Sequence, residues 1–247
     1  TKFDDLNISN YATDSVGGKV SFSYPIDETE TISFSVGYDL TDIKLGSNPS
    51  KLVNDFVNNE TDSLATYAAT TSWSRNTLNR GVFPTAGGSQ TVALELGLPG
   101  SDVSFYKLTY NGQRYFPLHR SWVGRGYARL GYGDGISGEG VPFYRNFFGG
   151  GFGSVRGYRD NSMGPRSPLL DTTTDPATLL TGTEPEAVGG NVQIEGGLEL
   201  IFPTPFLEDN SKVRTLAFLD AGNIFDTRIE GPLGETYKPD FGQLRYS

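Results

Sequence analysis

The chain has 247 residues, no cysteine and a formal charge of −9 at neutral pH. The lack of cysteine excludes a disulfide framework and any site built on thiolate ligands. The acidic balance argues against nucleic acid as a partner, because proteins that bind nucleic acid present a basic surface. The mean hydropathy of −0.35 does not exclude a membrane β-barrel, whose strands are apolar on one face only.

Alternation of apolar and polar residues dominates the chain and predicts strands with one apolar and one polar face. In the first such segment, Val20 and Phe22 share one face while Lys19 and Ser21 share the other. Most of the predicted strands have about 9–11 residues, the length that a tilted strand needs to cross a bilayer. Eight clear strands are predicted, with two further fragments at 3–8 and 244–247: 16–26, 32–40, 67–74, 91–98, 106–111, 122–132, 192–200 and 213–221.

One short helix is predicted within the connection 41–62. Asn48 is a suitable N-cap and Pro49 suits the first helical turn. The apolar residues that follow recur at helical spacing: Leu52, Val53, Phe56 and Val57.

The connections between the strands favour a barrel that crosses a membrane. Tight links at 25–30 and 117–121 contrast with long links at 41–62, 134–190 and 226–241. The long links fall on one side of the sheet, as extracellular loops lie opposite periplasmic turns in outer-membrane barrels. Aromatic residues at many strand ends fit an interfacial girdle. A soluble β-sandwich also alternates and remains the alternative.

The long link 134–190 contains a glycine-rich loop, 149–158, with Arg156 near its tip. Glycine permits tight backbone turns, and a guanidinium can bind carboxylates in a bidentate manner. Glu199 lies on the polar face of its strand, and Asp220 is the one acid on a strand that is otherwise apolar except for Arg214. We therefore expect the loop to fold into the barrel lumen, where Arg156 pins it to these two acids. The alternative is a mobile loop with an exposed arginine and ordinary lumen carboxylates.

The segment 155–158, Val-Arg-Gly-Tyr, resembles the arginine-glycine-aromatic signature of the BamA family, the barrel subunits of the outer-membrane β-barrel assembly machinery. Further segments resemble this family in the expected order and cover nearly the whole chain: 78–85, 99–102, 131–135, 142–144, 149–150, 164–165, 198–206, 213–215 and 218–222. The resemblance implies an all-β fold, part of a sixteen-stranded antiparallel transmembrane β-barrel with about nine strands present. The POTRA domains and the first and last strands of that barrel would then lie outside residues 1–247.

The resemblance also implies a function in the bacterial outer membrane, namely the folding and insertion of β-barrel proteins without enzymatic activity. The implied partners are outer-membrane lipids, assembly-machinery lipoproteins and unfolded outer-membrane proteins, with no cofactor or metal. The residues expected to form a structural latch are Val155, Arg156, Gly157, Tyr158, Glu199 and Asp220.

Two other classes of function remain as alternatives. A translocation pore of the two-partner secretion type also carries an arginine-glycine loop, but the segments 78–85 and 131–135 favour the BamA family. A barrel enzyme needs a nucleophile and a base. The single histidine, His119, lies in a predicted tight turn with no evident partner, so the sequence argues against this class.

Overall fold

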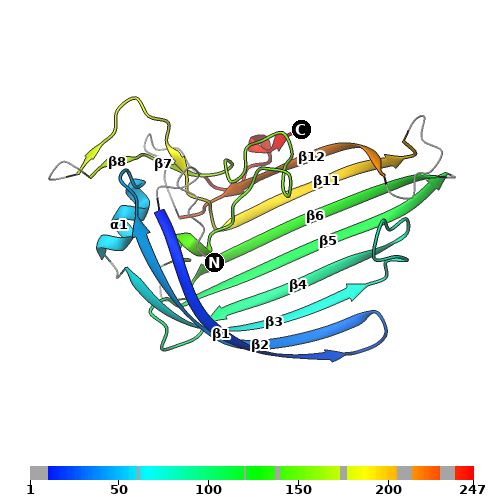
Figure 1. The fold of residues 1–247 in the computed structure, drawn as a ribbon, viewed down its shortest axis with the longest axis horizontal. Helices are drawn as coiled ribbons and strands as arrows, with labels where there is room; N and C mark the ends of the chain where they lie inside the picture. The colour runs from blue at the N-terminus through cyan, green and yellow to red at the C-terminus, as the bar shows by residue number, and fades with distance from the viewer. Residues whose placement is uncertain are drawn as a thin grey trace.

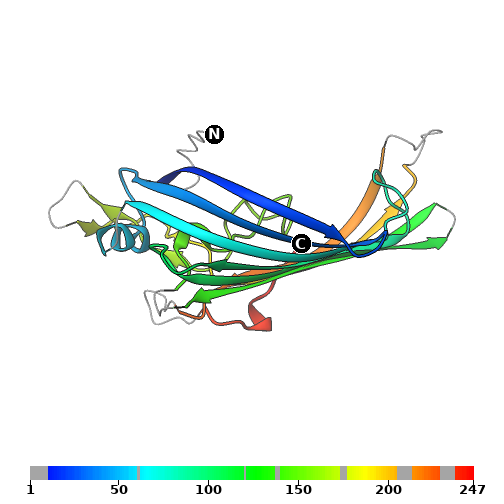
Figure 2. The ribbon, with the colours of Figure 1, turned by 90° about the horizontal axis from the view of Figure 1, so that it is seen from below.

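The computed structural model describes residues 11–59, 62–119, 121–136, 140–172, 177–204, 213–228 and 237–247. Its main feature is one antiparallel sheet of nine strands, in the order β1-β2-β3-β4-β5-β6-β11-β12-β13. The sheet curves and stays open, with β1 and β13 as its edges within the described residues (Figure 1, Figure 2). The fragment expected at 3–8 lies outside the described residues.

The structure confirms all eight predicted strands and extends most of them. β5 runs well past its expected end at 111, because its ladder with β6 continues through Pro117 although the clean alternation has ended. The fragment at 244–247 forms the short strand β13. The strands of the sheet are β1 (Tyr11–Pro25), β2 (Glu30–Leu45), β3 (Ser63–Asn76), β4 (Gly87–Gly97), β5 (Phe105–His119), β6 (Trp122–Gly135), β11 (Val192–Phe202), β12 (Thr215–Phe225) and β13 (Arg245–Tyr246).

The two faces of the sheet differ in polarity, as the alternation predicts. The outer face carries large apolar side chains that no other part of the described chain covers, including Val20, Phe22, Phe34 and Leu198. The inner face carries buried charged residues, such as Glu199 from β11. Burial of apolar side chains in a core cannot explain the outer face, whereas contact with lipid does.

The long connections gather at one end of the sheet, together with α1 (Lys51–Asn59), the one α-helix among the described residues (Figure 1). The expected cap was wrong: the helix begins after Ser50, whose Oγ accepts from the N–H of Val53 at 3.5 Å. Asn48 instead donates to the carbonyl of Leu170, since the segment before α1 pairs with the long loop. Among the described residues, no helix has the length and apolarity needed to span a membrane.

A small hydrophobic core lies at this loop end, between α1, the sheet and the long loop. It lets the connections pack on one another. Its buried members are Ile43, Val53, Leu64, Val103, Phe105, Val141 and Phe143. A second, smaller cluster of Tyr115, Val123 and Ile201 lies on β5, β6 and β11.

The long loop connects β6 to β11 and holds little regular structure. It contains a 3-10 turn, η1 (Phe143–Arg145), near its start. Another 3-10 turn, η2 (Phe241–Gln243), lies outside this loop and precedes β13. Two small ladders complete the loop: β7 (Arg166–Ser167) pairs with β10 (Glu186–Ala187), and β8 (Leu170–Asp171) pairs with β9 (Thr178–Leu179).

Candidate functional site

The glycine-rich loop turns back on itself at residues whose backbone only glycine adopts readily. Gly150 has φ +98°, and a Cβ there would lie 2.4 Å from the carbonyl oxygen of Arg159. Gly157 has φ +85°, the left-handed region that a side chain disfavours. These two positions set the path that brings Arg156 to the inner face of the sheet.

Arg156 makes a bidentate ion pair with Asp220 on β12. Its Nε lies 2.6 Å from Oδ2 and its Nη2 lies 2.7 Å from Oδ1. The backbone N–H of Arg156 also donates to Oδ2, at 3.2 Å. The guanidinium also makes a cation–π contact with Phe218, its Cζ lying 3.8 Å from the ring centroid. Three donors from one residue therefore converge on a single carboxylate.

The same guanidinium also pairs with Glu199 on β11, at 2.9 Å between Nη1 and Oε1. The other oxygen of Glu199 accepts from Arg125 on β6, also at 2.9 Å. Arg125 is held in turn by Gln113 on β5, whose Oε1 accepts from Nε and Nη2. Two arginines and two carboxylates thus alternate along the inner face, and their formal charges cancel.

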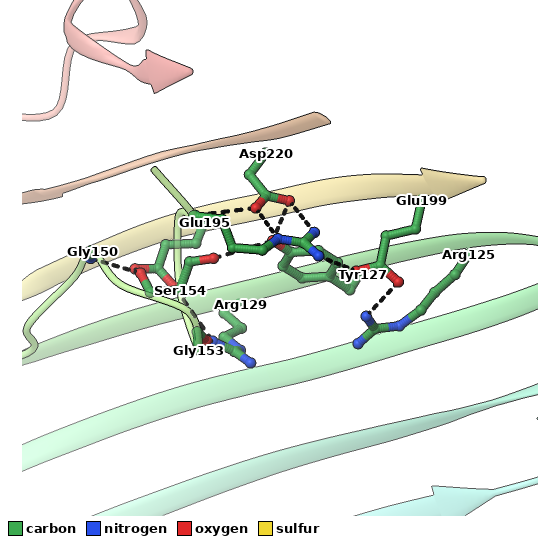
Figure 3. A network of polar contacts seen from close by, with 10 residues as sticks. Arg125, Tyr127, Arg129, Gly150, Gly153, Ser154, Glu195, Glu199 and Asp220 are labelled. Atoms are coloured by element: carbon green, nitrogen blue, oxygen red, sulfur yellow. Dashed lines mark hydrogen bonds and ion pairs between the residues drawn. The ribbon is translucent and has the colours of Figure 1, made fainter. Parts of the chain in front are cut away.

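A second group of contacts holds the loop immediately before Arg156 (Figure 3). Ser154 donates to Glu195 on β11 and accepts from the N–H of Gly150 at 2.9 Å. Arg129 on β6 donates to the carbonyl of Gly153 and lies 3.8 Å from Glu195. The loop is therefore attached to the sheet through its backbone as well as through the Arg156 side chain.

Tyr127 on β6 connects the two groups. Its hydroxyl donates to Oδ1 of Asp220 at 2.8 Å and lies 3.3 Å from the carbonyl of Ser154. Figure 3 shows Tyr127, Glu199 and Asp220 directed toward one another from three neighbouring strands.

Burial raises the cost of breaking these interactions. The side chain of Asp220 is fully buried, that of Glu199 is 6% exposed and that of Arg156 is 13% exposed. Hydrogen bonding to Asp220, with the charges of Asp220 and Glu199, raises the pKa of Arg156 above its usual range although burial opposes this shift. Removing one member of such a pair strands the other charge, which is the costly way to break a buried ion pair.

The other residues expected in the latch lie nearby, and within the described residues they make no hydrogen bond or ion pair with the two acids. Val155 is a fully buried residue of the loop. Tyr158 donates to the backbone carbonyl of Tyr246 on β13 at 3.3 Å. A Cβ at Gly157 would lie 3.3 Å from Cβ of Ser247. These residues bring the loop against the last strand rather than against Asp220.

The long loop has a second attachment, at Arg145 in η1. Its Nη2 lies 2.7 Å from Asp39 on β2, and its Nη1 lies 3.3 Å from Glu95 on β4. Lys107 on β5 donates to the backbone carbonyl of Arg145 at 2.6 Å. The loop therefore contacts the inner face at both ends of the strand order.

The sequence reasoning missed several residues of the network. Alternation along 122–132 puts Arg125 and Arg129 on the polar face of that strand but does not identify their partners. Tyr127 shares that face and gave no separate signal. Ser154 lies in the glycine-rich loop and carries no pattern of its own. Among the described residues, no group of histidine and acidic side chains is arranged to bind a metal ion.

Comparison with known proteins identifies the family. The Omp85 superfamily domain matches residues 2–247. The outer membrane protein assembly factor BamA of Neisseria meningitidis serogroup B is 30% identical over 98% of this chain and 32% of its own length. A SAM50-like protein of Schizosaccharomyces pombe is 28% identical over 68% of this chain and 33% of its own length.

A solved structure agrees with these relatives. The crystal structure of BamA from Haemophilus ducreyi lacking POTRA domains 1–3 has a TM-score of 0.81 and 28% identity. The match covers 96% of this chain and 47% of that one. The chain thus spans about a third of the length of the curated relatives it matches. It belongs to the Omp85 superfamily, and over nearly its whole length it is similar to BamA.

Proposed function

We propose that this chain is part of the barrel component of the machinery that folds β-barrel proteins and inserts them into the bacterial outer membrane. The observation that carries the proposal is the similarity to an assembly factor, BamA of Neisseria, over 98% of this chain. Because the chain spans 32% of that protein, the activity belongs to the whole protein that contains it. The apolar outer face supports a location within the membrane.

Within that component, we propose that Arg156, Glu199 and Asp220 form a structural latch that keeps the loop 134–190 inside the barrel lumen. The bidentate pair with Asp220 and the second pair with Glu199 support this role. Val155, Gly157 and Tyr158 support the path of the loop beside the latch. The residues 1–247 are then one partial barrel domain.

The proposed function is not enzymatic. The barrel acts on unfolded outer-membrane proteins as substrates and works with outer-membrane lipids and assembly lipoproteins. His119, the only histidine, is the last residue of β5 and pairs with Trp122 across the tight turn, which gives it a structural place. The similarity to BamA does not favour a secretion pore of the two-partner type.

The test is assembly of a model outer-membrane barrel by the whole protein, reconstituted with its lipoproteins in lipid vesicles. We expect wild-type protein to accelerate assembly over vesicles alone, and Arg156→Ala to lose most of that acceleration. Arg159→Ala is the matched control, because Arg159 is an exposed arginine three residues along the same loop.

The outcomes separate the function from the latch. Wild-type protein that gives no acceleration contradicts the assembly function itself. An Arg156→Ala variant that folds and assembles substrate as fast as Arg159→Ala contradicts the latch alone.

A further inference from the structure

The outer face of the sheet is interrupted by a cationic hollow. The hollow has a volume of about 600 Å³ and includes Arg75 from β3 and both Tyr110 and Arg114 from β5 in its lining. Gln90 from β4 lies between them and also lines it. We call these four residues with their surroundings the arginine hollow.

The hollow exists because the positions around Arg114 carry no side chains. Arg114 pairs with Gly88 on one neighbouring strand and with Gly126 on the other. Gly112, the next outward residue of β5, pairs with Gln90 and with Ala128. The backbone of the sheet therefore lines the bottom of the hollow, and the hydroxyl of Tyr110 lies directly over Gly112.

The two arginines are poorly neutralised. Arg75 lies 3.6 Å from Glu30, a long ion pair, and its side chain is 49% exposed. Arg114 is exposed, and within the part of the chain that the structure describes it has no ion pair. Its guanidinium lies 5.3 Å from the ring centroid of Phe116, toward the turn end of the strand. An unpaired cation such as Arg114 on a lipid-facing surface is costly unless it reaches the interface or binds an anion.

The hollow lies near the end of the sheet with the short turns. Both tryptophans of the chain, Trp73 and Trp122, mark this end. Trp73 is two residues from Arg75, and Trp122 stacks on Phe202 at 5.3 Å. Such aromatic residues lie at the level of lipid headgroups. Short turns face the periplasm in outer-membrane barrels, so the adjacent leaflet is the one made of phospholipid.

We propose that the arginine hollow binds the phosphate of an anionic glycerophospholipid of the periplasmic leaflet. Arg114 and Arg75 approach the phosphate oxygens from two strands whose backbones are about 10 Å apart, with β4 between them. Arginine suits this task because its planar fork matches phosphate geometry. The hydroxyl of Tyr110 and the amide of Gln90 supply further donors, and the apolar outer face around the hollow contacts the acyl chains. This site goes beyond the proposed assembly function and does not depend on the Arg156 latch.

The test is native mass spectrometry of the whole protein released from membranes that contain equal amounts of phosphatidylglycerol and phosphatidylcholine. We expect wild-type protein to retain phosphatidylglycerol in preference to phosphatidylcholine. Arg114→Gln reduces the apparent affinity for phosphatidylglycerol by about tenfold, the effect of losing one charge-assisted contact. Arg114→Lys keeps the positive charge but loses the planar guanidinium, and we expect it to reduce the apparent affinity for phosphatidylglycerol less than Arg114→Gln does.

Arg159→Gln is the matched control, because it removes one exposed positive charge from the long loop and leaves the hollow intact. Heat-modifiable migration in gels establishes that each variant is folded. Equal retention of the two lipids by wild-type protein overturns the proposal, and so does an equal loss in Arg114→Gln and Arg159→Gln. A third arm adds inorganic phosphate: displacement of the lipid by millimolar phosphate would assign the hollow to a free anion and overturn the lipid site.

Discussion

Replacing Asp220 by asparagine tests the energetic importance of the latch. The substitution preserves the shape of the side chain but removes its charge. In the wild-type protein this carboxylate accepts from the N–H, Nε and Nη2 of Arg156 and from the hydroxyl of Tyr127. An asparagine amide offers one oxygen for these four donors and turns its NH₂ group toward the others.

The expected cost follows from this geometry. Breaking a buried ion pair by removing one partner costs about 3–5 kcal/mol. Arg156 retains Glu199 at 2.9 Å, and its side chain keeps 13% exposure, so its charge is not wholly stranded. We therefore expect Asp220→Asn to lower the free energy of unfolding by about 2–3 kcal/mol, the value of one to two charge-assisted hydrogen bonds.

The assay is urea unfolding of the whole protein in micelles, followed by the gel mobility difference between folded and unfolded forms. Asp14→Asn is the control, because Asp14 pairs with Lys44 at 2.5 Å in an exposed position. Exposed pairs contribute about 0–1 kcal/mol, so this variant shows the effect of losing one carboxylate charge without burial.

The reasoning is refuted if Asp220→Asn and Asp14→Asn destabilise the protein equally. A double-mutant cycle with Arg156→Ala sharpens the result, since it isolates the interaction between the two side chains. A coupling energy near zero would mean that Asp220 stabilises the barrel through contacts other than Arg156.

Three further predictions concern the same loop. Glu195→Gln weakens the attachment of the loop through Ser154. We expect limited proteolysis of the folded protein to cut the loop about tenfold faster, while the urea concentration at the unfolding midpoint changes little. An unchanged cleavage rate would contradict this prediction. Gly157→Ala places a Cβ at φ +85° and costs about 1–2 kcal/mol in the same urea assay; a neutral effect would show that the loop can shift without loss. The pKa of Arg156 is raised, so the stability that this group contributes is fully present below the pKa of an arginine in the unfolded chain and is lost only as the pH rises toward the higher pKa of the folded protein. The coupling energy between Arg156 and Asp220 should therefore be the same at about pH 7 and about pH 10, and a fall at the higher pH would contradict an arginine-based pair.

Much of the fold could be predicted because the side chains of a strand alternate between two faces. A lipid-facing outer side and a charged inner side follow directly from that alternation. The prediction failed in detail where local signals compete. Asn48 and Ser50 are both good N-caps, and only the pairing of this segment with Leu170 decides between them.

The site was harder to predict because its partners depend on register. Arg125 lies directly opposite Glu199, and Arg129 lies opposite Glu195, on adjacent strands β6 and β11. The long loop separates these strands in sequence, so periodicity gives the face of each residue but not its neighbour. Ser154 could not be found at all, since its contact with Glu195 depends on the folded path of the loop.

Asp220 connects the loop to the last described strand segment through its backbone as well as its side chain. While its side chain holds Arg156, its backbone N–H and carbonyl both pair with Ser247, at 2.9 and 3.0 Å. The ion pair that fixes the loop and the backbone pairing of Ser247 with β12 therefore both involve Asp220. Any coupling between these two contacts is reciprocal, so the effect of the loop contact on the pairing with Ser247 equals the effect of that pairing on the loop contact. A force that separates Ser247 from β12 acts on the backbone of Asp220. It therefore acts at the residue whose side chain holds Arg156 and the loop.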